Sequence, residues 1–164
     1  MNSLTLSILI TAALGSGMMA GLFCSFSSFV MKALSETPPP MGITAMQSIN
    51  KVIVRPAFLV VFLGTGVACA LVVGLGWQQL GNHALAWATV GGVVYVLGSI
   101  VVTIVFNVPL NNRLAAVDPE SDEGAKMWGI YLVRWIRWNH VRSIATIAST
   151  LLLILAVLRA SGRA

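Results

Sequence analysis

Residues 57–80 of the chain read AFLVVFLGTGVACALVVGLGWQQL and contain no Asp, Glu, Lys, Arg or His. A helix of about 20 apolar residues crosses the roughly 30 Å hydrocarbon core of a bilayer. The apolar residues form a continuous run and do not alternate with polar ones, which favours a helix over a strand. We therefore predict that this stretch is a membrane-spanning helix.

Three further stretches of the same kind predict a bundle of spans. They run from about Leu4 to Met31, from Ala84 to Phe106, and from about residue 142 to residue 159. No Lys or Arg precedes Lys32, so we expect the first stretch to be a span and not a cleavable signal peptide. The predicted fold class is all-α, an integral membrane bundle of four transmembrane helices that forms a single membrane domain over residues 1–164.

The composition also indicates a chain embedded in lipid. Of the 164 residues, 57% are hydrophobic and 9% are charged, whereas roughly a quarter of the residues of a soluble domain are charged. The lipid bilayer is therefore the first expected partner. The net charge of +5 comes from scattered residues without a basic run, so we expect no nucleic-acid partner. The sequence leaves open whether the chain forms a homo-oligomer.

The first and third connections are long enough to hold short interfacial helices. Pro38, Pro39 and Pro40 end the first span, and a helix is predicted after them from Met41 to Val54. Another is predicted from about Glu120 to Asn139, where acidic residues suit a helix N-terminus. The second of these helices can also run on into the fourth span.

The distribution of Lys and Arg predicts the orientation in the membrane. Eight of these residues lie on the side of the two long connections, and only Arg159 and Arg163 lie on the other side. Basic residues favour the cytoplasmic side of a span. We therefore expect a multi-pass protein with cytoplasmic long connections and both termini outside.

Small residues mark predicted contacts between spans. Small side chains let helices approach closely where lipid gives no hydrophobic drive to associate. They recur at helical spacing as Gly17, Gly21, Ser25 and Ser28 on the first span, and as Gly66, Ala70 and Gly74 on the second.

The third span ends in a polar segment that permits two interpretations. Thr103, Asn107 and Asn111 are four residues apart and share one helical face. Pro109 interrupts the pattern and frees backbone carbonyls near Asn107. The segment is either a helix end that caps itself with Asn side chains or part of a binding site.

The densest polar pattern precedes the fourth span. Trp128, Tyr131, Trp135, Trp138 or Asn139, and Arg142 follow the spacing of one helical face. An interfacial helix with an aromatic belt explains the tryptophans. It explains Asn139, His140 and Arg142 less well, because polar groups at the entrance of a span usually face the bundle interior. Imidazole is a common proton acceptor in enzymes, so His140 is either a proton acceptor or a structural hydrogen-bonding group.

One pocket could collect these groups. Gln47 and Asn50 lie three residues apart on the helix predicted in the first connection, on the same side of the membrane. The residues expected to converge there are Gln47, Asn50, Asn107, Asn111, Asn139, His140 and Arg142. We expect no metal site, because the acids lie in the connections and no paired His or Cys motif is present.

Four segments resemble the anthrone oxygenase-like family, a group of small four-helix membrane proteins whose bacterial members mostly have no assigned function. The segments are residues 21–31 (GLFCSFSSFVM), 45–50 (AMQSIN), 107–114 (NVPLNNRL) and the run from Trp128 to Arg142. The resemblance covers nearly the whole chain, and the Asn–Pro and Trp–Asn–His segments are its most specific parts. Lys32 stands where the family often has proline, which bears on where the first helix ends.

The resemblance implies a cofactor-independent oxygenase in the bacterial inner membrane. The family's named fungal members oxidise anthrones to anthraquinones, so the expected substrate is a lipophilic, anthrone- or quinol-like aromatic that loses a proton and reacts directly with O₂. The implied catalytic residues are His140 as the base, with Asn107, Asn139 and Arg142 holding an oxyanion. The predicted substrate-binding residues are Gln47, Asn50, Asn111, Tyr131, Trp135 and Trp138.

Two other classes of function stay open at this point. One is a protein that binds or transports a lipophilic ligand in the same pocket without turnover. The other is a structural membrane subunit. The sequence alone therefore does not decide whether the protein is an enzyme.

Overall fold

The computed structural model describes residues 2–162, and this part of the chain is helical and contains no strand. The elements in chain order are α1 (Ser3–Ser25), η1 (Phe26–Val30), α2 (Met31–Ser35), α3 (Pro39–Ile53), α4 (Pro56–Gly76), α5 (Asn82–Tyr95), η2 (Val96–Val101), η3 (Thr103–Asn107), α6 (Val108–Ala115) and α7 (Asp122–Ala160), where η marks a π-helical segment. They join into four helices long and apolar enough to cross a membrane, Ser3–Ser35, Pro56–Gly76, Asn82–Ala115 and Asp122–Ala160. The predicted all-α membrane bundle of four spans is confirmed.

π-helical turns keep the first and third long helices continuous. In η1, the N–H of Met31 donates to the carbonyl of Phe26, five residues back. In η3, the N–H of Val108 donates to the carbonyl of Thr103, and Pro109 follows in the first turn of α6. A proline inside a helix lacks one hydrogen bond and clashes with a carbonyl of the preceding turn, and a π turn makes room for it. We expected Pro109 to interrupt the third helix. The structure shows instead that the helix continues through Pro109.

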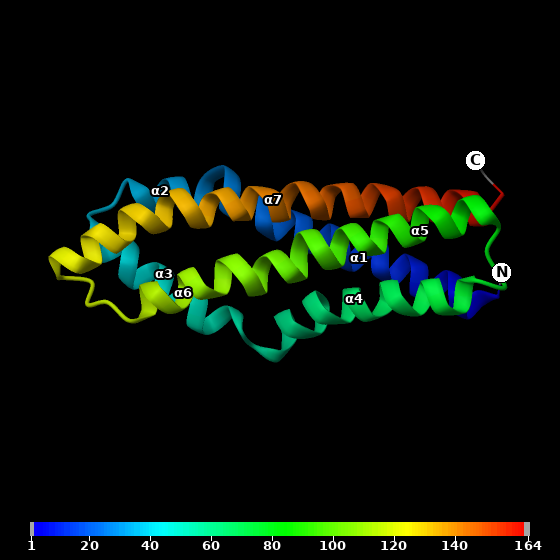
Figure 1. Ribbon diagram of the computed structural model, residues 1–164, viewed down its shortest axis with the longest axis horizontal. Helices are drawn as coiled ribbons and strands as arrows, with labels where there is room; N and C mark the ends of the chain where they lie inside the picture. Colours follow the sequence, from blue (N-terminus) through cyan, green and yellow to red (C-terminus); the bar gives the residue numbers. More distant parts are fainter. Residues whose placement is uncertain (1, 163–164) are drawn as a thin grey trace.

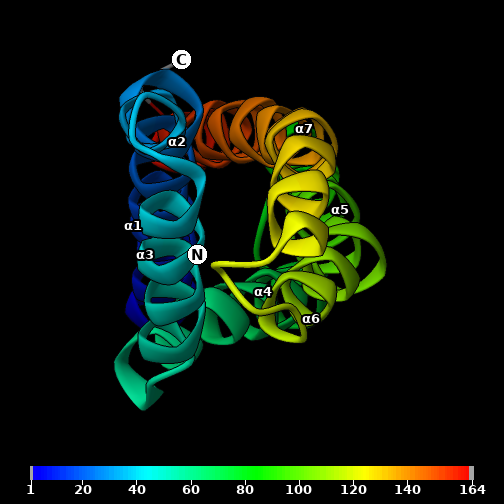
Figure 2. The same ribbon diagram turned by 90° about the vertical axis from the view of Figure 1, so that its left-hand side faces the viewer.

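The four long helices form a closed ring of neighbours (Figure 2). α7 packs between α1 and α5, and α4 packs against the same two helices from the other side. Figure 1 shows the two long connections at one end of the bundle, with the start of α1 and the end of α7 at the other. The two long connections are thus on one side, as the sequence predicted.

The two long connections differ in structure. The first holds α3, which matches the predicted helix and begins slightly earlier because proline suits the first turn of a helix. The third holds only residues 116–121 between α6 and α7. Ser121 caps α7 by accepting a hydrogen bond from the N–H of Gly124, and α7 then runs unbroken to Ala160. The helix predicted from about Glu120 is therefore the first part of α7 and not a separate interfacial helix.

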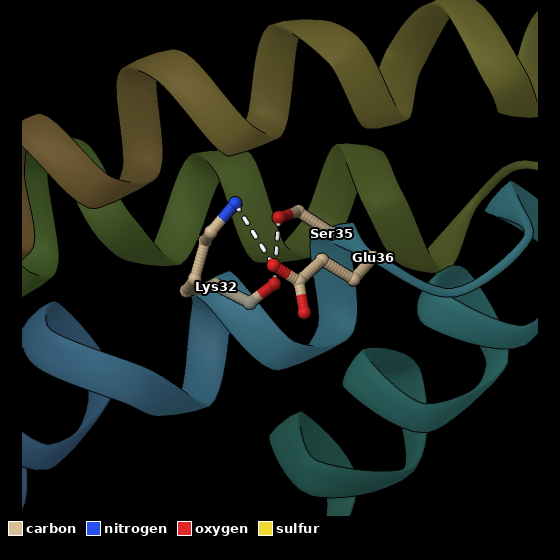
Figure 3. A network of polar contacts seen from close by, with 3 residues as sticks. All are labelled: Lys32, Ser35 and Glu36. Carbon is tan, nitrogen blue, oxygen red and sulfur yellow. Dashed lines mark hydrogen bonds and ion pairs between the residues drawn. The ribbon is translucent and has the colours of Figure 1, made fainter.

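The first span ends at Ser35 and not at Met31, as Figure 3 shows in detail. Lys32 Nζ lies 3.0 Å from Glu36 Oε1, and Ser35 Oγ donates to the carbonyl of Lys32 at 2.7 Å. The ion pair is exposed on both sides, so it contributes little stability. The Lys32 carbonyl also accepts from the Glu36 N–H at 3.2 Å, so Ser35 gives it a second hydrogen bond at the end of the helix.

The bundle contains two hydrophobic cores, one after the other along its long axis. α7 has 39 residues and is roughly 58 Å long at 1.5 Å per residue, far more than the hydrocarbon core requires. One core, which includes Leu9, Val72 and Leu153, lies among the four spans. The other, which includes Met46, Leu114 and Trp128, lies among α3, α6 and the first half of α7. The buried polar residues Asn107, Asn139, Arg142 and Ser143 lie on α7 and the third long helix, where these two cores meet.

Some of the close contacts between helices occur at small residues that the sequence analysis did not predict. A Cβ on Gly98 would collide with the side chain of Ala145 on α7, and one on Gly66 would lie 2.8 Å from Ile100. A Cβ on Gly21 or on Gly74 would have no heavy atom within 4 Å. The contact between the third helix and α7 therefore depends on Gly98, which the spacing of small residues did not identify.

Candidate functional site

Arg142 is the centre of the buried polar residues. Its side chain is 6% exposed. Nη2 donates to Asn139 Oδ1 at 2.7 Å, and Nη1 donates to Thr103 Oγ1 at 3.1 Å. The guanidinium carbon also lies 4.3 Å from the centre of the Phe23 ring and 5.2 Å from that of Trp135. Three helices therefore hold the guanidinium by neutral groups and aromatic faces.

No carboxylate lies beside this guanidinium. Within residues 2–162, the only ion pair is the one between Lys32 and Glu36. The five acids of the chain all lie in the two long connections or in the first turn of α7. Arg142 Nε is buried and has no hydrogen-bond partner among residues 2–162. A buried charge normally has an ionic partner, so this site is positively charged and lacks its counterion.

Asn139 links Arg142 to the first helix. Its Nδ2 donates to the carbonyl of Phe23 at 2.8 Å and to Ser27 Oγ at 2.7 Å. Its Oδ1 accepts from Arg142, so its described hydrogen bonds use both ends of the amide. Ser27 also bonds with Ser143 at 3.1 Å. We call Arg142, Asn139, Thr103 and Ser27 the inner polar cluster.

Asn107 lies near Arg142, at the same level of the bundle, and is 1% exposed. Its Nδ2 donates to the carbonyl of Trp135 at 3.3 Å. Its Oδ1 has no partner, and neither has the indole N–H of Trp135. The layer around Arg142 therefore holds one unused acceptor and two unused donors, in a region where polar groups are usually satisfied.

A cavity of about 320 Å³ opens next to the inner polar cluster. This volume is typical of a small-molecule site. Its walls come from α1, η1, α3, α4, η3, α6 and α7, and are mainly aliphatic and aromatic. The polar residues in the wall are Asn50, Thr103, Asn111 and Arg142. Of the described residues, no Asp, Glu, His or Lys lines the cavity.

The mouth of the cavity faces the side of the bundle. Val54, Leu63, Ile104 and Val108 line the cavity and are also 39% to 62% exposed. They lie at the end of α3, on α4 and on the third helix, and all four are aliphatic. The opening of the cavity is therefore lined by apolar side chains.

A second polar group lies farther along the cavity, toward the connections. Tyr131 is fully buried, and its hydroxyl donates to Asn111 Oδ1 at 2.8 Å. The same hydroxyl accepts from Asn50 Nδ2 at 3.3 Å. We call Asn50 and Asn111 the outer amide pair. Tyr131 also stacks between Trp128 and Trp135, with ring centres 5.7 and 5.6 Å away, which fixes its ring.

Four of the predicted site residues, Asn50, Asn111, Trp135 and Arg142, line the cavity, and Asn107, Tyr131 and Asn139 are buried beside it. The other three point elsewhere. Gln47 donates through Nε2 to the carbonyls of Leu114 and Val117, so it closes the end of α6. Trp138 stacks on Phe106 at 3.6 Å between ring centres. His140 is exposed, because it lies about 100° around the helix from the inward-facing Asn139. Of the seven residues expected to converge, the structure brings together Asn50, Asn107, Asn111, Asn139 and Arg142, whereas Gln47 and His140 lie elsewhere.

Phe23 and Ser27 are part of the site but were not predicted. Both lie on the first helix, where every residue from Leu4 to Met31 lacks a charge and no polar stripe marks the inner face. Phe23 contacts the guanidinium and Ser27 accepts from Asn139. The only sequence signal was their place in the segment 21–31, which supported the family resemblance.

The chemistry available at this site is recognition and stabilisation of an anion. Hydrogen-bond donors and a positive charge in a water-poor cavity stabilise negative charge far more strongly than in water. Within residues 2–162, no three His, Cys, Asp or Glu side chains gather as metal ligands do. Asn50, Asn111 and the aromatic walls can orient a flat apolar ligand.

Comparison with known proteins agrees with this picture. The family model for anthrone oxygenase matches residues 44–152, which is more than half of the chain and includes every predicted site residue. No curated protein and no solved structure matches the chain. Phe23 and Ser27 precede the matched region. The chain belongs to the anthrone oxygenase family.

Proposed function

We propose that the protein is a membrane oxygenase that binds a lipophilic aromatic substrate of the anthrone or quinol type and holds its anion against Arg142. The observation that carries this proposal is the buried guanidinium without a carboxylate, in the wall of an apolar cavity. The family membership supports the oxygenase class.

The buried Arg142 guanidinium has no carboxylate partner among residues 2–162. Removing an ion from water costs several kcal/mol even after the protein relaxes. Two neutral hydrogen bonds and two aromatic faces offset only part of that cost for Arg142. An anionic ligand in the cavity would offset the rest. The same charge would favour ionisation of a weakly acidic substrate, because it stabilises the ionised form.

The reaction then needs little from the protein beyond this charge. Loss of a proton from the CH₂ carbon of an anthrone leaves an electron pair that delocalises onto the ketone oxygen. O₂ forms a bond with that carbon and takes up the electron pair, and one proton completes the hydroperoxide. Loss of the remaining C–H proton breaks the O–O bond and releases hydroxide, which becomes water. One anthrone and one O₂ thus give one anthraquinone and one water.

The proton acceptor in this proposal is water or hydroxide at the cavity and not His140. His140 is exposed and lies outside the cavity wall, and a general base must reach the proton directly or through one water. Arg142 acts by stabilising the ionised substrate, which lowers the pKa of the substrate's CH₂ group. Asn139 and Thr103 are positioning residues, because they hold the guanidinium.

Oxygen uptake tests the proposal. Protein in lipid nanodiscs would be mixed with anthrone, and oxygen consumption and anthraquinone absorbance would be followed against empty nanodiscs. We expect faster oxidation with the native protein and a loss of about 100- to 1000-fold for Arg142→Met, as for the loss of an oxyanion-stabilising donor. Equal rates for the native protein, Arg142→Met and empty nanodiscs would refute the oxygenase proposal.

A second candidate is a carrier or binding protein for the same class of anion. The observation in its favour is that the cavity wall contains no Asp, Glu, His or Lys to serve as a base. Such a protein would bind a hydroxylated anthraquinone in an Arg142-dependent way and would consume no oxygen with anthrone.

We further propose that the long connections face the cytoplasm of a bacterial inner membrane. Seven of the eight basic residues on that side are exposed; the exception is Arg142, which is buried and does not count toward membrane orientation. Seven against two still favours this orientation. Labelling of single cysteines placed at Lys51 and at Asn82 in intact cells would test it: only the second should react with an impermeant reagent.

A further inference from the structure

Asn50 and Asn111 present complementary hydrogen-bonding atoms at the outer end of the cavity. The Tyr131 hydroxyl donates to Asn111 Oδ1 and accepts from Asn50 Nδ2. This leaves the Nδ2 donor of Asn111 and the Oδ1 acceptor of Asn50 without another hydrogen bond among the described residues. Tyr131 is itself fully buried and stacked, so it sets which atom each amide presents.

One donor beside one acceptor fits a hydroxyl group. A hydroxyl can accept a hydrogen bond and donate one at the same time, whereas an ether or a ketone can only accept. The outer amide pair would therefore bind a neutral hydroxyl better than any other single oxygen function. The positive inner polar cluster would bind an oxyanion.

The two polar groups are at different depths along one wall. Thr103, which contacts the guanidinium, and Asn111 are eight residues apart on the third helix. At the rise of an α-helix this is roughly 12 Å. The wall between them is apolar and includes Ile104 and Val108. A rigid fused-ring molecule with an oxygen at each end matches this arrangement.

The outer end also opens on a groove toward the connections. A groove of about 410 Å³ between α3 and α6 shares Asn50, Val54, Val108 and Asn111 with the cavity, and also includes Lys51 and Asn112. A hydroxyl bound by the outer amide pair would thus lie at the border between the apolar cavity and a more polar surface. A polar edge is tolerated there at low desolvation cost.

We propose that Asn50 and Asn111, oriented by Tyr131, form a second subsite that selects polycyclic aromatics with a hydroxyl on the edge opposite the oxyanion. This inference rests on the proposed function for the anion at Arg142. It adds a requirement on the substrate, namely two oxygen functions at opposite ends of a flat ring system.

A matched pair of probes tests the subsite without turnover. 2-Hydroxyanthraquinone carries one acidic hydroxyl, and 2,6-dihydroxyanthraquinone carries a second on the opposite edge. Binding to detergent-solubilised protein would be followed by quenching of tryptophan fluorescence and by the phenolate absorbance. We expect the dihydroxy probe to bind about tenfold more tightly to the native protein, which is the usual gain from one or two hydrogen bonds.

Three variants separate the subsite from the anion site. Asn111→Leu should remove the tenfold preference, so that the two probes bind this variant with equal affinity. Tyr131→Phe, which keeps the stacked ring, should reduce the preference by freeing the amides to turn. Arg142→Met should weaken both probes together.

The outcomes distinguish the two proposals. Equal affinities for both probes in the native protein, with Arg142→Met still weakening both, would overturn the outer subsite and leave the anion site intact. Probes that bind equally to native protein and Arg142→Met would overturn the anion site. A preference that persists in both Asn111→Leu and Tyr131→Phe, with unchanged melting temperatures, would also overturn the outer subsite.

Discussion

We expect Arg142→Met to separate stability from ligand binding, because in the proposed function the guanidinium holds a ligand anion. The side chain is 6% exposed and has no carboxylate partner in the described chain. Removing the charge saves a desolvation cost of several kcal/mol. Against this, Asn139 Oδ1 loses its donor, at a cost of about 1–3 kcal/mol. The cation–π contact with Phe23 contributes about 1–2 kcal/mol more.

These opposing contributions leave the variant within about 2 kcal/mol of the native protein in the absence of ligand. With ligand the difference should be large. An anion bound at 100 times its dissociation constant stabilises the native protein by about 2.7 kcal/mol. Without the charge, the loss of one or two charge-assisted hydrogen bonds, at about 1.5–3 kcal/mol each, removes most of that stabilisation.

Thermal unfolding in detergent, with and without 2-hydroxyanthraquinone, measures both effects. The native protein should melt higher with the probe, and Arg142→Met should melt at the same temperature in both conditions. Arg137→Met is the matched control, because Arg137 is exposed on the same helix and its loss should preserve the shift. A variant that fails to fold, or that keeps the full ligand shift, would show that Arg142 is a structural residue and refute the reasoning.

Three further predictions test other parts of the structure. His140→Ala should oxidise anthrone at the native rate, since the side chain lies outside the cavity; a loss above tenfold would reinstate it as the base. Gly98→Leu should lower thermal stability by about 1–3 kcal/mol by forcing α7 away, whereas Gly74→Ala, with open space around it, should be neutral or slightly stabilising. Thr103→Asp should weaken binding of 2-hydroxyanthraquinone as strongly as loss of Arg142, because it supplies an internal carboxylate, while Thr103→Val should weaken it much less; equal effects of the two would contradict the counterion argument.

The spans were predictable because long apolar runs leave few alternatives. The bilayer requires every backbone group to be paired within the segment, so the main part of a run such as residues 57–80 must be a helix. The structure has this helix over Pro56–Gly76, and residues 77–80 form the turn that follows it. The ends were less predictable. α7 runs through Arg142 and upstream to Asp122 because a second core of Trp128 and its neighbours packs on its first half. That packing involves α3 and α6, which the local sequence of α7 does not reveal.

The site was predictable in its residue types but only partly in its geometry. Spacing on one helical face correctly grouped Tyr131, Trp135, Asn139 and Arg142, all of which are buried. His140 was also predicted to lie in the site because it is polar and follows Asn139. Neighbouring residues on a helix point in different directions, however, and His140 is exposed. The sequence shows which residues share a face of one helix. It does not show which face of a neighbouring, uniformly apolar helix they contact.

The π-helical turns connect these observations. Ser27, Thr103 and Asn107 all lie in π-helical turns, and each is at the layer of Arg142. Proline explains η3, but η1 has none. There, Asn139 Nδ2 donates to the carbonyl of Phe23, just before η1, and a side chain inserted into the helix ladder is a known cause of such turns.

Two helices thus depart from regular geometry at the level where an unpaired charge meets a cavity. π turns are rare and are frequent at functional sites, and an unpaired buried charge is costly. Packing alone would favour regular helices and an apolar side chain at position 142. The two π-helical turns η1 and η3 beside the buried Arg142 therefore support the proposal that this site binds an anionic ligand.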